Sequence, residues 1–138
     1  MPTDTDDHSN NPVQSFYDRQ PELEWGRLDV HRMEFAVTLR AMKEYLPKPP
    51  AAVLDIGGGP GRYALTLTQS GYDVTLCDLS PASLDVARKK AQDCGVHFND
   101  VFQADARDLK RIPNGKYDTV LLMGPLYHLL AEEDRRKP

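Results

Sequence analysis

The sequence of 138 residues has little of several features that mark particular classes of protein. It holds two cysteines, Cys77 and Cys94, too few for a disulfide scaffold, and we expect both to be reduced, buried thiols. Its longest apolar runs reach a few residues, so no segment is typical of a transmembrane helix. The first 15 residues lack the basic start and apolar core of a secretory signal. These absences predict a cytoplasmic domain with no membrane partner.

Basic residues are also in the minority. The chain has 17 Lys and Arg against 21 Asp and Glu, a formal net charge of −4. Domains that bind nucleic acid over a broad surface are usually basic, so we predict no nucleic-acid partner. No cysteines and histidines have zinc-ligand spacing, and we predict no metal site. The remaining composition, 28% charged and 40% hydrophobic, is that of an ordinary globular domain.

Three segments follow one another along the chain. Residues 1–14 are rich in Asp, Ser, Asn and Thr, which predicts a disordered tail. Residues 15–50 form a helical segment, with a turn at 15–18 and a long helix from Asp29 to Leu46 that stops before Pro47. Two apolar rows on this helix indicate that more than one of its faces is covered. The rows are Met33, Val37, Ala41 and Tyr45, and Phe35, Leu39, Met42 and Leu46.

Residues 51–138 alternate short apolar runs with helical patterns. The runs predict strands at 52–56, 73–77, 101–104 and 117–123. Helices are expected at 62–70 and from Ser80 to Gly95, the second with an apolar stripe that ends at Cys94. Buried-type strands in this alternation predict an α/β fold, a doubly wound parallel sheet covered on both faces.

The glycine loop at 57–61 fits two templates. Residues 59–64, Gly-Pro-Gly-Arg-Tyr-Ala, match the G-x-G-x-x-A dinucleotide fingerprint. Residues 53–61 also read as a strand with an acidic residue followed by alternate glycines. Asp55 separates the two interpretations, because a carboxylate next to the loop would repel a pyrophosphate and attract an ammonium group. Arg62, which follows the loop, is expected to be a solvated cation.

The run Val-Leu-Asp-Ile-Gly-Gly-Gly-Pro-Gly-Arg-Tyr-Ala at 53–64 resembles the first motif of the class I S-adenosylmethionine-dependent methyltransferases. The resemblance covers roughly residues 50–130 and implies a Rossmann-like sheet of order 3-2-1-4 with S-adenosylmethionine as cofactor. It implies that Asp55 holds the cofactor's amino group, Asp78 the ribose hydroxyls and Asp105 the adenine amino group. Asp108 is the alternative to Asp105. The loop glycines that would pass under the methionine part are Gly57, Gly58, Gly59 and Gly61.

Residues 117–129 resemble the family's fourth motif, which flanks the methyl group and the acceptor. His128 in this motif is the candidate general base, and a structural histidine is the alternative. Methyl transfer from a sulfonium depends mainly on positioning, so no nucleophile is expected from the chain. The further residues that we count as cofactor-binding are Tyr17, Leu79, Ala106 and Met123.

The predicted function is methyl transfer to a small-molecule acceptor, or the cofactor-binding part of such an enzyme. The family's sheet has seven strands and four are recognisable here, so we expect residues 51–138 to be a truncated form of the domain. Its fourth strand would then be an exposed apolar edge, which predicts a homodimer or a partner chain covering it. An NAD(P)-dependent oxidoreductase domain and a non-catalytic binding or dimerisation module stay as alternatives.

Overall fold

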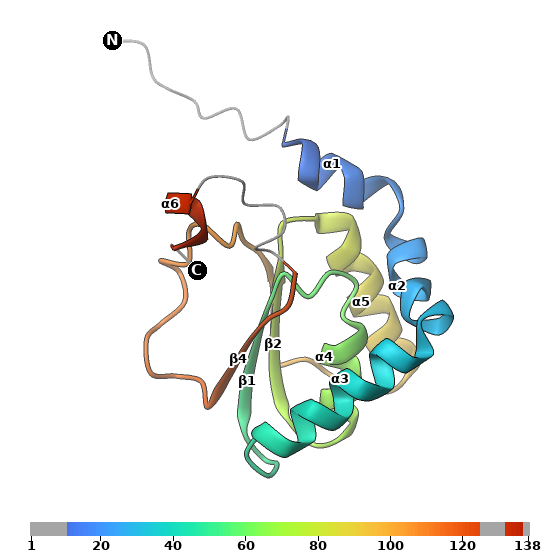
Figure 1. Ribbon diagram of the computed structural model, residues 1–138, viewed down its shortest axis with the longest axis vertical. Coiled ribbons are helices and arrows are strands. Elements are labelled where there is room, and N and C mark those ends of the chain that lie inside the picture. The colour runs from blue at the N-terminus through green and yellow to red at the C-terminus, as the bar shows by residue number, and fades with distance from the viewer. Residues whose placement is uncertain (1–10, 125–131, 137–138) are drawn as a thin grey trace.

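A computed structural model describes residues 11–124 and 132–136 of the chain (Figure 1). The expected general base, His128, lies outside the described residues. Of the tail expected over residues 1–14, only residues 11–14 are described. Among the described helices, none has the length and apolar character needed to span a membrane.

Within the described residues, four parallel strands form one sheet in the order β3-β2-β1-β4, which confirms the predicted order. The strand at the centre, β1, pairs with β2 from Ala52↔Asp73 to Ile56↔Cys77 and with β4 from Val53↔Thr119 to Ile56↔Leu122. Because all the strands run in one direction, their carboxyl ends share one edge of the sheet. The strands are β1 (Ala52–Ile56), β2 (Asp73–Asp78), β3 (Asp100–Gln103) and β4 (Thr119–Leu122).

Helices α3 (Arg32–Tyr45), α4 (Arg62–Gln69) and α5 (Pro81–Asp93) lie to one side of this sheet (Figure 1). Their apolar side chains pack on the strands, and this packing buries the main core. The local sequence explains α5, since the Ser80 hydroxyl accepts the Ser83 N–H at 3.2 Å and Pro81 occupies the first helical position. The core residues are Met42, Val53, Ala64, Leu67, Val74, Leu76, Leu84, Ala87 and Leu121.

A second, smaller core lies on the opposite face of the sheet. Residues 104–117 cover it without a helix, and they contribute Ala106, Leu109 and Ile112 to it. Both faces of the sheet are therefore covered, but within the described residues the helices that pack on it belong to one face. The buried members of this core are Leu54, Ile56, Cys77 and Phe102.

The outer edge of β4 has no neighbouring strand among the described residues, and Val120 on this strand is 53% exposed. This agrees with the expected apolar edge. A homodimer or a partner chain at the edge stays a prediction.

From residue 11, where the described part of the chain begins, three helices precede the sheet, where a turn and one long helix were expected. The first, α1 (Pro12–Arg19), begins inside the predicted tail because Asn11 caps it: the Asn11 side chain accepts the N–H groups of Val13 and Gln14 at 2.9 and 3.4 Å. The next, α2 (Pro21–Val30), ends at His31, whose backbone (φ −98°, ψ 53°) is not helical. The helix predicted from Asp29 therefore starts at Arg32, on the other side of this break.

The two apolar rows of α3 have different surroundings. Phe35, Leu39 and Leu46 are half-buried and Met42 is buried, so this row meets the core. The other row is open, with Met33 80% and Tyr45 86% exposed. Described residues thus cover only one of the two rows.

The prediction of two buried thiols is half wrong. Both cysteines are free and Cys77 is buried, but Cys94 is exposed. The prediction placed Cys94 on the apolar stripe of a helix, but α5 ends at Asp93 and Cys94 is its C-cap residue. Beyond the last turn the helical spacing no longer directs a side chain into the core.

Candidate functional site

The glycine loop joins the end of β1 to α4 and lies beside the end of β2. The N–H groups of Gly57 and Gly58 donate to the carbonyl oxygen of Cys77 at 2.8 and 3.3 Å. Gly57, Gly59 and Gly61 have φ of 69°, 58° and 80°, backbone conformations that favour glycine. Gly61 then accepts the N–H of Leu65 at 2.8 Å, which closes the first turn of α4. The loop thus follows a strand and opens a helix, as predicted.

Asp55 lies buried under this loop. Its side chain is 2% exposed, and a Cβ atom on Gly58 would stand 2.5 Å from its Oδ2 and 2.4 Å from Cδ1 of Leu76. Burial first, and then the negative charge of Asp78, raise the pKa of Asp55 to about 7. The carboxyl of Asp55 therefore takes up a proton near neutral pH, and a cationic neighbour would favour its ionised form.

Asp78 ends β2 on the other side of the loop. Its Oδ2 accepts the N–H of Gly59 at 2.8 Å, and its Oδ1 accepts the N–H of Ser80 at 2.9 Å. Burial raises the pKa of Asp78, and these backbone N–H groups oppose that effect. One carboxyl thus lies beneath the glycine loop and a second is bonded to it.

Helix α1 approaches the same edge of the sheet. Burial, followed by the charges of Glu24 and Asp78, raises the pKa of the Tyr17 phenol, so this side chain lies within electrostatic reach of Asp78. Asp18, the next residue, accepts hydrogen bonds from the Ser80 hydroxyl and from the N–H of Ala82. The sequence prediction of Asp78 as a site residue did not extend to Asp18, since no local pattern links a residue of a short helix to a serine 62 positions away.

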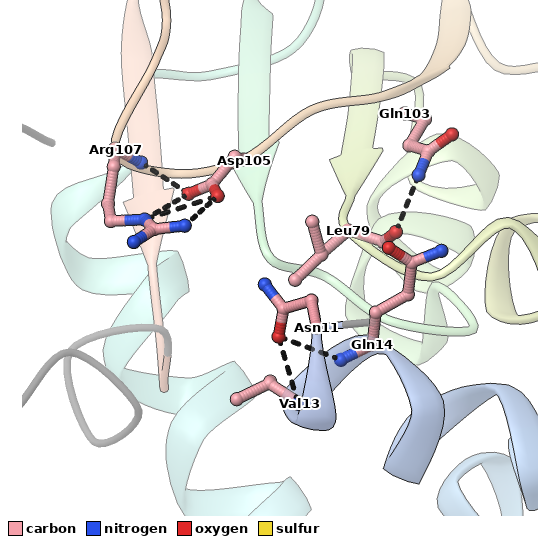
Figure 2. A network of polar contacts seen from close by, with 7 residues as sticks. All are labelled: Asn11, Val13, Gln14, Leu79, Gln103, Asp105 and Arg107. Carbon is pink, nitrogen blue, oxygen red and sulfur yellow. Dashed lines mark hydrogen bonds and ion pairs between the residues drawn. The ribbon is translucent and has the colours of Figure 1, made fainter. Parts of the chain in front are cut away.

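The end of β3 is tied to the end of β2 by the Gln103 side chain, which donates to the carbonyl oxygen of Leu79 at 3.0 Å (Figure 2). Asp105 follows, and its carboxylate pairs with Arg107, with 2.6 Å between Oδ2 and Nη2. Figure 2 also shows the Asn11 side chain at the start of α1, where it caps this helix through the N–H groups of Val13 and Gln14.

The chain matches the methyltransferase domain family over residues 53–137. It belongs to this family. The chain is 32% identical over 136 residues to glycine/sarcosine N-methyltransferase of Parasynechococcus marenigrum (strain WH8102), across 97% of this chain and 46% of that protein. It is 31% identical over 137 residues to glycine/sarcosine/dimethylglycine N-methyltransferase of Actinopolyspora halophila, across 97% of this chain and 23% of that protein. The chain thus spans less than half the length of these two relatives.

The fold agrees with a solved methyltransferase structure. Magnesium protoporphyrin IX methyltransferase from Synechocystis PCC 6803, solved with bound SAH, superposes with a TM-score of 0.62 over 78% of this chain and 55% of that chain, at 23% identity. The family match and the relative of 32% identity confirm the predicted methyltransferase family, and with it S-adenosylmethionine as cofactor. Family membership also decides between the two interpretations of the glycine loop, against the dinucleotide template.

The fold brings most of the predicted cofactor residues to one edge of the sheet. Asp55, the loop glycines, Asp78 and Leu79 lie at the ends of β1 and β2, with Tyr17 beside them. Asp105 and Ala106 follow β3, and Met123, 37% exposed, follows β4. Asp108, the alternative to Asp105, is exposed. The cofactor roles of these residues stay predictions.

Arg62 is not the solvated cation that was expected. Its guanidinium carbon lies 4.8 Å from the ring centroid of Trp25 and 5.4 Å from that of Phe35, and its Nη2 lies 2.5 Å from Asp29 Oδ1. Cation–π and charge contacts of this kind hold a helix end in place. Sequence reasoning missed them because all three partners come from α2 and α3, far along the chain.

The first prediction concerns Gly58. Gly58→Ala puts a methyl group within 2.5 Å of both Leu76 and Asp55, so the loop must move, at a cost of about 1–3 kcal/mol in the free energy of unfolding. Gly26→Ala is the matched control, because a Cβ atom there meets nothing within 4 Å. Urea unfolding of both variants measures the difference. Equal stability of the two would contradict the close contact.

The second prediction concerns the pH dependence of stability. The pKa of Asp55 is about 7 in the folded protein, and its ordinary value is 3.8. Its contribution to the free energy of unfolding is therefore full below pH 3.8 and is lost as the pH rises to about 7. The loss is on the order of 4 kcal/mol. Asp55→Asn removes this titration. The free energy of unfolding of the variant, relative to that of the wild type, should therefore be higher at pH 8 than at pH 5.

Urea unfolding at both pH values, without cofactor, gives this comparison. Asp73→Asn, at the exposed start of β2, controls for the loss of one negative charge. A stability difference between wild type and Asp55→Asn that does not change with pH would refute the buried titration.

Proposed function

We propose that this chain forms the cofactor-binding part of an enzyme that transfers a methyl group from S-adenosylmethionine to the amino group of a small molecule. The observation that carries the proposal is the pair of carboxyl groups around the glycine loop. Asp55 lies beneath the loop, and Asp78 is bonded to the N–H of Gly59 at 2.8 Å. A ligand that presents an ammonium group to Asp55 and a pair of hydroxyls to Asp78 would suit these two carboxyl groups.

The residues of this edge fit the parts of the cofactor. Each Asp78 oxygen accepts one backbone N–H, and a carboxylate has about four lone-pair sites, so both ribose hydroxyls can still donate to it. A Cβ atom on Gly59 would meet no described atom within 4 Å, so the outer side of the loop is open to a ligand. Asp55 would face the ammonium group, and Asp105 the adenine amino group. The rest of the cofactor site would be lined by Tyr17, Leu79, Ala106 and Met123.

Bound S-adenosylmethionine supplies a methyl group on a positively charged sulfur. The chain's own task is to hold that group in line with the acceptor and to keep water away, because displacement at the methyl carbon depends on positioning. An ammonium acceptor must first lose a proton, and we assign this step to His128, which lies outside the described residues.

The N-terminal helices support a proposal for the acceptor class. Residues before 53 lie outside the family match, yet the glycine/sarcosine N-methyltransferase of Parasynechococcus marenigrum aligns with 97% of the chain and so with these helices as well. Shared helices that border the cofactor edge favour a shared acceptor class. We therefore propose a small amino acid, of the glycine and sarcosine type, as the acceptor.

The third prediction tests the proposal through Asp78. Asp78→Ala should weaken the binding of S-adenosylmethionine and S-adenosylhomocysteine by about 1.5–3 kcal/mol, because hydrogen bonds to a charged group are lost. Calorimetry measures both affinities, with Asp73→Ala, an exposed carboxylate at the opposite end of β2, as the control. Unchanged affinity in a folded Asp78→Ala protein would remove Asp78 from the site. Binding of NAD alone by the wild type would overturn the proposed function.

A further inference from the structure

Asp18 makes a contact that cofactor binding does not by itself require. This residue lies on α1, and its Oδ1 accepts the hydroxyl proton of Ser80 and, at 3.4 Å, the N–H of Ala82. Ser80 is fully buried and caps α5, where its Oγ accepts the N–H of Ser83 at 3.2 Å. A carboxylate at the start of a helix is also favoured by the partial positive charge there. The contact joins segments 62 residues apart in the sequence.

Ser80 is bonded to the proposed ribose ligand as well. Its N–H donates to Asp78 Oδ1 at 2.9 Å, and the other oxygen of Asp78 accepts the N–H of Gly59 at 2.8 Å. A continuous chain of hydrogen bonds therefore runs from Asp18 through Ser80 and Asp78 to the glycine loop. Linked hydrogen bonds of this kind polarise and orient one another.

We propose that Asp18 is a positioning residue for cofactor binding: by holding Ser80 it fixes the orientation of Asp78, and so couples the docking of α1 to ribose recognition. The inference rests on the proposed function, in which Asp78 binds the ribose hydroxyls. A serine hydroxyl rotates freely unless a partner takes its proton. With Asp18 present, the proton of Ser80 points to α1 and the oxygen lone pairs face Ser83, which keeps the Ser80 backbone in place to bond Asp78.

The position of Tyr17 supports the coupling. It precedes Asp18 on α1, and the charge of Asp78 is one of the causes that raise the pKa of its phenol. Helix α1 therefore bonds the start of α5 through Asp18, and the preceding residue carries a phenol within electrostatic reach of Asp78. Displacement of α1 would alter the surroundings of Asp78.

Calorimetry with two ligands separates positioning from mere docking of α1. The ligands are S-adenosylhomocysteine and its 2′,3′-dideoxy analogue, which lacks the hydroxyls that Asp78 would bind. Asp18→Ala should weaken binding of the first by about tenfold and of the analogue by less than about twofold. Asp18→Asn keeps an oxygen that accepts the Ser80 proton, so it should restore affinity to within about threefold of the wild type.

Glu22→Ala is the matched control. Glu22 also connects the N-terminal helices to α5, with 3.5 Å between its Oε2 and Nζ of Lys90, but Lys90 lies in the last turn of α5, away from Asp78. Its affinity for both ligands should equal that of the wild type. Equal losses for both ligands in Asp18→Ala, or no loss for either, would overturn the positioning role.

Amide hydrogen exchange of the free protein provides a second measurement that needs no ligand. Asp18→Ala should speed exchange of the Ser80 and Gly59 amides by about tenfold relative to Glu22→Ala, and unchanged exchange there would contradict the coupling. If the wild type shows this coupling but binds no S-adenosylhomocysteine, the proposed function fails and the hydrogen-bond chain stands. If Asp18→Ala does not fold, Ser80→Ala breaks the same contact from the other side and must show the same dependence on the ribose hydroxyls.

Discussion

The contact between the Asp55 carboxyl and the backbone of the glycine loop constrains the whole cofactor edge. The loop passes so close to this carboxyl that position 58 has no room for a side chain, and the turns on either side use left-handed glycines. Burying a carboxyl here is costly in the free protein, as the pKa of about 7 for Asp55 reflects. A cationic group placed on the loop would offset that cost. The burial of Asp55 would therefore favour a ligand with an ammonium group.

The edge is built by two parts of the chain. The family match begins at residue 53 and includes the strands and the glycine loop. The helices before it reach the same edge at two places: Arg62 is held between Trp25 and Phe35, and Ser80 is bonded to Asp18. Both Arg62 and Ser80 stand at helix starts that adjoin the site. The N-terminal helices therefore pack against the edge of the sheet that carries the glycine loop.

Local sequence signals were sufficient for the sheet and for the loop. Strand β1, the glycines and the Ser80–Pro81 start of α5 each carry their pattern within a few residues, and the strand order follows from the family's topology. The features that were missed depend on partners far along the chain or on backbone geometry. An arginine such as Arg62 is usually a surface residue. Its position here depends on Asp29, 33 positions away, and on the two aromatic rings. The break at His31 interrupts a helical pattern that continues on both sides, so periodicity alone could not reveal it.

The most direct test is a carbon-13 NMR titration of the Asp55 carboxyl, in the free protein and with S-adenosylhomocysteine bound. The account predicts a pKa near 7 for Asp55 in the free protein, caused by burial and by Asp78. With the ligand's ammonium group on the loop, the pKa should fall to below about 5, since an adjacent opposite charge favours the ionised carboxyl. The same pKa in both states, or a value near 4 in the free protein, would contradict the central role given to Asp55.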